Sequence, residues 1–208
     1  MKHFLTAAAI CFCYSIASAQ TRQTDVSHHG FYLSLGTGAV FGNIRGSNNY
    51  GDRLTIKGTA AGVDIQIGGS IHENLLLHAT LGVKSMFGFK INDQKIDGGY
   101  SFDEDFLGLG VTKYTKKNFF ATANAGIATY GFSNDNITST NDDHSTKAGF
   151  SFNVKAGKEW AIGKRMGLGG TIFYSRTYIR SAQDGMVEKW GSNRVGIYFQ
   201  ATYNKTRK

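Results

Sequence analysis

The chain has 208 residues, a length that suits one domain, and carries a formal net charge of +8 with 27 glycines and no proline. Its positive charges form no run of five and no basic motif, so nucleic acid is not an expected partner. Proline removes a hydrogen-bond donor and is excluded from central strands, so its absence suits a chain that is mostly β-sheet.

The first 19 residues have the three-part pattern of a secretory signal peptide. Lys2 and His3 give a short positive region, residues 5–16 form an apolar stretch, and residues 17–19 spell an A-x-A cleavage site. Both cysteines of the chain lie in this segment, so the mature fold does not depend on disulfides. We therefore expect a cleaved signal peptide at residues 1–19 and one mature barrel domain at residues 20–208.

Eight later segments alternate between apolar and small or polar side chains with the period of a β-strand. In the first of them, the odd positions from Phe31 to Phe41 are mostly apolar, whereas the even positions are mostly small or polar. Each segment has about the 9–11 residues that a transmembrane strand needs, and no later stretch of eighteen apolar residues predicts a membrane helix. The expected strands cover residues 31–41, 59–69, 75–86, 102–112, 119–130, 149–159, 167–177 and 193–203.

The connections between these segments alternate between short and long. Short ones occupy residues 70–74, 113–118 and 160–166, whereas residues 42–58 and 131–148 are examples of the long polar ones. Short periplasmic turns and long extracellular loops are the rule for barrels of the bacterial outer membrane.

In the middle portions of the strands, the apolar face carries no Lys, Arg, Asp or Glu, and the charged residues are expected on the polar face. A Lys or Arg that faces lipid at the bilayer midplane costs about 2–4 kcal/mol, whereas the same charge inside a barrel can find a partner. We interpret the inward set as an ion-pair network that fills the lumen, because an eight-stranded barrel is just wide enough for side chains to fill. The predicted network consists of Asp64, His78, Lys84, Glu104, Lys155 and Arg194.

Alternation alone also fits a soluble, lipocalin-like carrier with an apolar interior. Two observations favour the membrane barrel. The polar face is rich in Gly, Ser, Thr and Asn, whereas a surface in water usually carries more Lys and Glu. Aromatic residues also gather near the strand ends, as in the interfacial girdles of membrane barrels: Phe31, Phe41, Phe87, Phe89, Phe119, Trp160, Tyr174 and Tyr203. In a carrier, Leu33, Val63 and Ile197 would point inward.

The stretch GKEWAIGKRMGLGGTIFYSR at residues 157–176 resembles the sixth strand, turn and seventh strand of small OmpA/OmpX-type outer-membrane barrels, which often read G-K-E-W, a turn, then G-L-G. The stretch GGSIHENLLLHATLGV at residues 68–83 is similar to their first periplasmic hairpin. The resemblance extends over residues 30–203 and implies an all-β, eight-stranded antiparallel up-and-down transmembrane β-barrel in the bacterial outer membrane. It implies an architecture rather than an activity.

Three groups of residues have the chemistry of a reactive or metal site. Residues 142–145, Asp-Asp-His-Ser, suit a lipid-modifying or proteolytic barrel enzyme, His28 and His29 suit a metal, and residues 103–105, Asp-Glu-Asp, suit a cation with oxygen ligands. Solvated loops and strand ends explain these groups as well, so no catalytic residue, cofactor or metal is expected.

The expected function is that of a monomeric, non-catalytic barrel of structural, adhesion or envelope-interaction type. Its expected partners are outer-membrane lipids and lipopolysaccharide, with host or other extracellular surface ligands contacting the long loops. The alternatives are the membrane enzyme, the soluble carrier and a narrow channel.

Overall fold

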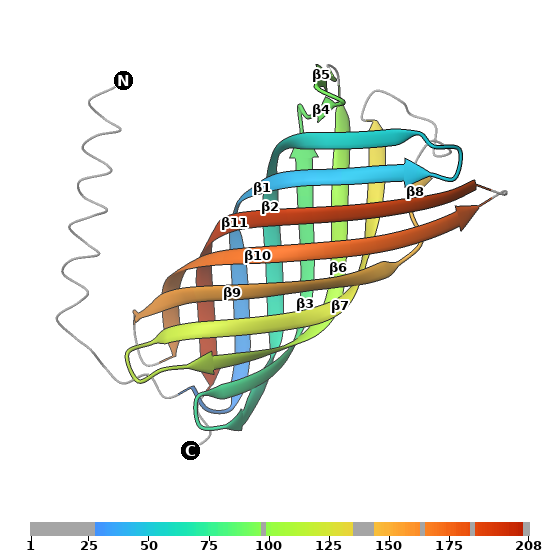
Figure 1. The fold of residues 1–208 in the computed structure, drawn as a ribbon. Helices are drawn as coiled ribbons and strands as arrows, with labels where there is room; N and C mark the ends of the chain where they lie inside the picture. The colour runs from blue at the N-terminus through green and yellow to red at the C-terminus, as the bar shows by residue number, and fades with distance from the viewer. Residues whose placement is uncertain (1–27, 97–98, 135–143, 163–164, 184–185, 206–208) are drawn as a thin grey trace, which may run out of the picture.

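A computed structural model describes residues 28–96, 99–134, 144–162, 165–183 and 186–205. Eight long strands form one closed antiparallel barrel (Figure 1). The barrel closes because β1 pairs with β11 as well as with β2, which leaves no free edge. The eight strands are β1 (Phe31–Asn48), β2 (Arg53–His72), β3 (Leu75–Phe87), β6 (Tyr100–Tyr114), β7 (Phe119–Asn134), β9 (Gly149–Ala161), β10 (Met166–Gln183) and β11 (Met186–Lys205). The expected eight-stranded up-and-down barrel is confirmed.

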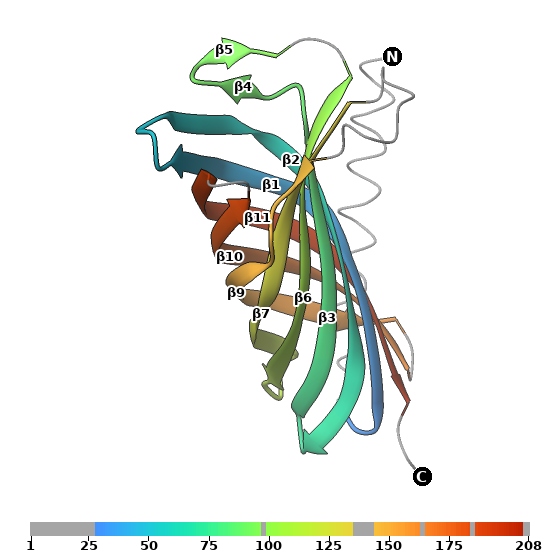
Figure 2. The same cartoon turned by 90° about the vertical axis from the view of Figure 1, so that its right-hand side faces the viewer.

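In the described part of the chain, three short strands lie at one end of the barrel. The hairpin of β4 (Lys90–Ile91) and β5 (Gln94–Lys95) pairs with β2, and β8 (His144–Ser145) pairs with β7. Figure 2 shows the β4/β5 hairpin beside the far end of β1 and β2. Among the described residues, no helix is long and apolar enough to span a membrane.

The strands run further at this end than the alternation predicted. β1 and β2 have 18 and 20 residues, and β10 and β11 have the same two lengths. The expected long loop at residues 42–58 is therefore wrong, because most of it continues the β1/β2 ladder and only residues 49–52 form the turn. The period of two persists there, with Ile44 and Ile56 buried, but polar outward neighbours such as Arg45 give the segment the composition of a loop.

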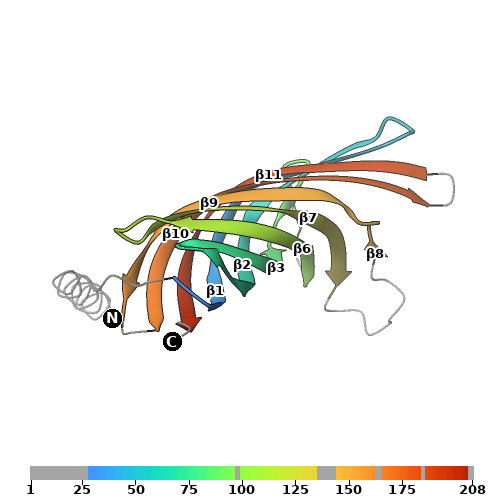
Figure 3. The same ribbon diagram turned by 90° about the horizontal axis from the view of Figure 1, so that it is seen from below.

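The apolar face of the barrel points outward. Val63 and Ile197 have 43% and 56% of their surface exposed, and Leu33 is partly exposed on the same face, so the carrier alternative is wrong. The exposed side chains form a belt in every long strand. Members of this apolar belt include Leu35, Val63, Leu81, Leu107, Ile127, Val154, Ile172 and Ile197. Figure 3 shows the barrel strands from below.

The inward placement of charges that the sequence predicts for the strand middles does not extend to the ends of the belt. Asp105, Lys158 and Arg176 all occupy outward positions. Lys158 tolerates its place because its Nζ lies 4.9 Å from the centre of the Phe119 ring, at the end of the belt where long side chains reach the interface. Arg176 similarly lies 4.6 Å from the ring centre of Tyr178. These charges mark the boundaries of the belt rather than its middle.

The expected aromatic girdle is mostly outward, with one exception. Phe31, Phe41, Phe87 and Phe119 are exposed on the outer face. Phe89 is buried and belongs instead to an apolar cluster inside the barrel, together with Phe102 and Tyr130, because the chain turns over the rim after β3.

Candidate functional site

The centre of the lumen is an ion-pair layer built on Glu104, whose surface is fully buried. Its Oε1 lies 2.6 Å from Nζ of Lys84, and its Oε2 lies 3.3 Å from Nη2 of Arg194. Lys84 also donates to Oγ of Ser175 at 3.1 Å. One carboxylate from β6 therefore joins a cation from β3 to a cation from β11.

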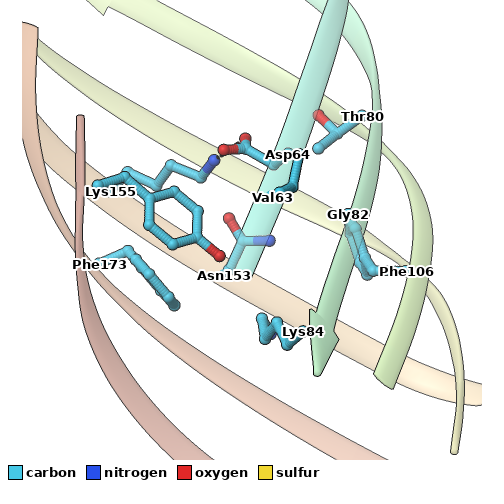
Figure 4. A pocket seen from close by; sticks show the side chains of 10 residues that line it. Val63, Asp64, Thr80, Gly82, Lys84, Phe106, Asn153, Lys155 and Phe173 are labelled. Atoms are coloured by element: carbon cyan, nitrogen blue, oxygen red, sulfur yellow. Dashed lines mark hydrogen bonds and ion pairs between the residues drawn. The ribbon is translucent and has the colours of Figure 1, made fainter. Parts of the chain in front are cut away.

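A second buried pair lies beside this layer. Lys155 and Asp64 extend from opposite walls toward each other and form an ion pair (Figure 4). Gln66 donates to Oδ2 of Asp64 at 3.2 Å and accepts a hydrogen bond from the hydroxyl of Tyr32, also at 3.2 Å. The side chains around these pairs leave a space of only about 20 Å³, which holds about one water molecule.

His78 is buried in the same lumen, but it bonds to hydroxyls. Its Nδ1 lies 3.1 Å from Oγ1 of Thr80, and its Nε2 lies 2.9 Å from Oγ1 of Thr112. The two ring nitrogens are thus occupied without a contact to Asp64 or Lys155. A proton-transfer set of these three residues is not assembled by direct hydrogen bonds.

The sequence analysis missed a third inward acidic position, Glu159. It is buried near the short-turn end of the barrel, where the hydroxyl of Tyr114 donates to its Oε2 at 2.9 Å. Its inward position in β9, four residues after Lys155, was the signal that could have identified it. Next to it, His28 stacks on Tyr114 with ring centres 3.5 Å apart, and burial lowers the pKa of His28 to about 4.

The six residues of the predicted network are therefore all buried in the lumen, but the structure divides them among separate contacts. With Glu159, the buried charged groups of the described chain are three carboxylates and three cations, namely Asp64, Glu104, Glu159, Lys84, Lys155 and Arg194. The formal charges balance only when Glu159 is counted, and this residue bonds to Tyr114 rather than to a cation of the ion-pair layer.

Above the ion-pair layer, the barrel opens into an apolar cavity of about 520 Å³, here called the mouth cup. Its wall comes from the strand segments that extend past the apolar belt and from the short strands β4 and β8. The lining residues are Leu54, Ile56, Ile91, Phe102, Tyr130, Gly131, Phe132, Ser145, Thr146, Ser181, Met186, Glu188 and Trp190. The sequence did not predict this cup, because its lining residues lie at the ends of the expected strands or beyond them.

The outer surface at the same end carries a cluster of cations, here called the basic face. It comprises Arg45, Arg53, Lys57, Arg176, Arg180 and Lys189. The ladder places these residues side by side: Arg180 lies opposite Lys189, Asn193 lies between Arg176 and Asn43, and Asn43 lies opposite Lys57.

No Asp or Glu occupies an outward position among these described segments of β10, β11, β1 and β2. In the part of the chain that the structure describes, one ion pair involves this face, and it joins Lys57 to Asp93 of the β4/β5 turn at 2.8 Å. That hydrogen bond and charge lower the pKa of the Asp93 carboxyl. The remaining cations have no acid among them on the face.

The structure does not assemble a site from the other residues that the sequence suggested for catalysis or cation binding. Asp142 and Asp143 lie outside the described residues. Asp103 and Asp105 point outward while Glu104 points inward, because successive strand residues alternate, so the three cannot share a cation. Among the described residues, no group of three His, Cys, Asp or Glu side chains is placed to hold a metal ion.

Comparisons with known proteins agree on the architecture. No family model matches the chain, and no curated protein sequence matches it. Among solved structures, neisserial surface protein A is similar, with a TM-score of 0.54 and 13% identity over 85% of this chain and 97% of that protein. The outer membrane protein OprG from Pseudomonas aeruginosa is similar with a TM-score of 0.50 and 10% identity, over 88% of this chain and 100% of that protein. The chain therefore has the fold of the small eight-stranded β-barrels of the bacterial outer membrane.

Proposed function

We propose that the chain is an integral outer-membrane protein of envelope-interaction type, and that its basic face binds the phosphate groups of lipopolysaccharide in the outer leaflet. A signal peptide at residues 1–19 would export it, and its role would be non-catalytic. The observation that carries the proposal is a group of cations directly beyond the apolar belt, with no Asp or Glu at the outward positions of the same strand segments.

The register supports this placement. The last row of the belt pairs Tyr174 with Val195, and Val195 with Phe41. Two residues further along the strands, Arg176 begins the basic face. Lipid phosphates lie just outside the hydrocarbon, where each Lys or Arg near the membrane surface contributes about 1 kcal/mol of attraction to anionic lipid.

The mutual arrangement of the cations also favours an anionic partner. Arg180 and Lys189 lie directly opposite each other on one face of the ladder, and like charges in that arrangement destabilise a sheet. A phosphate group between them would convert the repulsion into two attractive contacts, and guanidinium groups bind phosphate with paired hydrogen bonds.

The closed lumen favours this role over that of a channel. The Glu104–Arg194 and Asp64–Lys155 ion pairs cross the barrel, and the space between the side chains around them holds about one water molecule. The action of such a barrel would take place at its outer surface and its mouth.

Lipopolysaccharide binding to the folded protein tests the proposal. The double variant Arg180→Glu/Lys189→Glu should bind purified lipopolysaccharide at least about tenfold more weakly, because two attractions of about 1 kcal/mol are lost and become repulsive. Lys116→Glu/Lys117→Glu makes the same charge change in the exposed turn between β6 and β7 and should bind like the wild type. Equal binding by both variants, or undiminished binding of dephosphorylated lipopolysaccharide, would refute the phosphate contact.

Cell fractionation tests the membrane assignment separately. The mature protein should appear in the outer-membrane fraction and should migrate faster in an unboiled gel sample than in a boiled one, since a closed barrel resists detergent unfolding. Recovery as a soluble periplasmic protein would contradict the assignment.

A further inference from the structure

The mouth cup has the size and lining of a small-molecule site. Its volume of about 520 Å³ falls within the range of about 300–1,000 Å³ that is usual for ligand pockets. Three of its aromatic rings form one cluster: the centre of Phe102 lies 5.3 Å from that of Tyr130 and 6.2 Å from that of Trp190. Tyr130 and Trp190 lie 6.2 Å apart, nearly edge to face.

The cup is closed below. Phe173 and Tyr198 pack against each other with ring centres 4.6 Å apart in the same apolar cluster, and both rings also line the small space around Asp64 and Lys155. A molecule that entered from the open end would therefore meet a packed floor. The site suits retention of a ligand rather than its passage.

The charged groups that line the cup determine which ligand charge it favours. Among the described residues that line the cup, Glu188 is the one charged side chain, and none is Lys or Arg. Oε2 of Glu188 accepts a hydrogen bond of 3.0 Å from Nε1 of Trp190, which holds the carboxylate beside the ring. No cation of the described chain forms an ion pair with it. A carboxylate beside aromatic faces is the combination that binds organic cations.

The chain itself supplies little that could fill the cup. The segments outside the described residues near the rim in sequence are Asp97–Gly98, residues 135–143 with the sequence DNITSTNDD, and Asp184–Gly185. Together they contain one large apolar residue, Ile137. An apolar cavity is poorly matched by such polar segments, because their backbone and side-chain groups would lose water without gaining partners.

We infer that the mouth cup binds a small apolar amine from outside the cell. The apolar body of the ligand lies against Phe102, Tyr130 and Trp190, and its ammonium group lies at the carboxylate of Glu188. This site is separate from the basic face, which lies on the outer surface and carries the opposite charge.

Three probes with the same apolar body test the inference: 1-adamantanemethylamine, 1-adamantanemethanol and 1-adamantanecarboxylate. The protein is reconstituted in lipid nanodiscs, since detergent would itself occupy an apolar cup. The chain has two tryptophans, so Trp160→Phe leaves Trp190 as the sole fluorescent reporter in the cup. The amine should change Trp190 fluorescence with an affinity about tenfold above that of the alcohol, from combined cation–π and ion-pair attraction, and the carboxylate should bind most weakly.

Two further variants assign the binding to the cup. Glu188→Gln should bring the affinity for the amine down to that for the alcohol. Ser181→Phe places a ring on an inward, buried position that lines the cup and should abolish the response to all three probes. Ala182→Phe adds the same ring to the next residue, which faces outward, and should leave binding unchanged.

Partition of the probes into lipid would give the same signal in the Ser181→Phe and Ala182→Phe variants, and that result would overturn the inference. Equal affinity for amine and carboxylate would overturn the role of Glu188. Lipopolysaccharide binding should be the same in the Ser181→Phe variant and the wild type. Amine binding by the cup and phosphate binding by the basic face can therefore be refuted independently.

Discussion

Replacing Glu104 by glutamine should destabilise the barrel far more than replacing a surface carboxylate. The carboxylate is fully buried and lies 2.6 Å from Lys84 and 3.3 Å from Arg194. With an effective dielectric constant of about 20, these separations give gross attractions of about 6 and about 5 kcal/mol.

The cost of burying three ions offsets most of that attraction in the wild type. In Glu104→Gln, however, Lys84 and Arg194 stay buried and lose their shared counter-charge. The expected loss is therefore the about 3–5 kcal/mol that is typical when one partner of a buried pair is removed.

Urea unfolding of the protein in lipid vesicles, followed by tryptophan fluorescence, measures this loss. Lys84→Met should lose less than Glu104→Gln, because the contact between Glu104 and Arg194 survives. Asp93→Asn should cause no measurable change, since its pair with Lys57 is exposed to water. An unfolding free energy of Glu104→Gln equal to that of the wild type would refute the view that the ion-pair layer stabilises the barrel.

Two further predictions concern the short-turn end and the wall. Because burial lowers the pKa of His28 from 6.5 to about 4, the unfolded chain takes up a proton first on acidification. The contribution of His28 to stability should be constant above pH 6.5 and fall between pH 6.5 and about 4. His28→Phe keeps a ring against Tyr114 and should remove that part of the pH dependence, whereas equal slopes for both proteins in urea unfolding would argue against it. In Gly126→Ala, the new methyl group would collide with the backbone of Leu107 and Gly108, which should lower the unfolding free energy by about 1–3 kcal/mol. In Gly170→Ala, the methyl group meets no atom within 4 Å, so the unfolding free energy should not change in the same assay. A stable Gly126→Ala variant would mean that the β6/β7 ladder can widen.

The strand number, the antiparallel order and the outward apolar face could be predicted from the sequence. They depend on a period of two and on the cost of a charge in lipid, and both are local properties of each segment. The same rule predicts Asp64 and Lys155 on the inward face, and the two side chains form an ion pair although 91 positions separate them.

The partners inside the lumen could not be predicted. Lys84 lies directly opposite Glu104 in the β3/β6 ladder, whereas Arg194 reaches Glu104 from the other side of the barrel. That second contact depends on the stagger of strands that face each other across the barrel, and no single strand encodes this stagger. The mouth cup was missed for a different reason. Ile44 and Ile56 continue the inward row, but polar outward neighbours made the segment resemble a loop, so the alternation was not followed beyond the hydrocarbon.

The long strands also determine where the protein meets its surroundings. β11 has 20 residues, which at about 3.3 Å each and a tilt of about 40° rise on the order of 50 Å along the barrel axis. The apolar band of such barrels is about 25 Å tall. The barrel therefore extends above the bilayer at this end, and a molecule approaching from outside reaches its opening before it reaches the lipid.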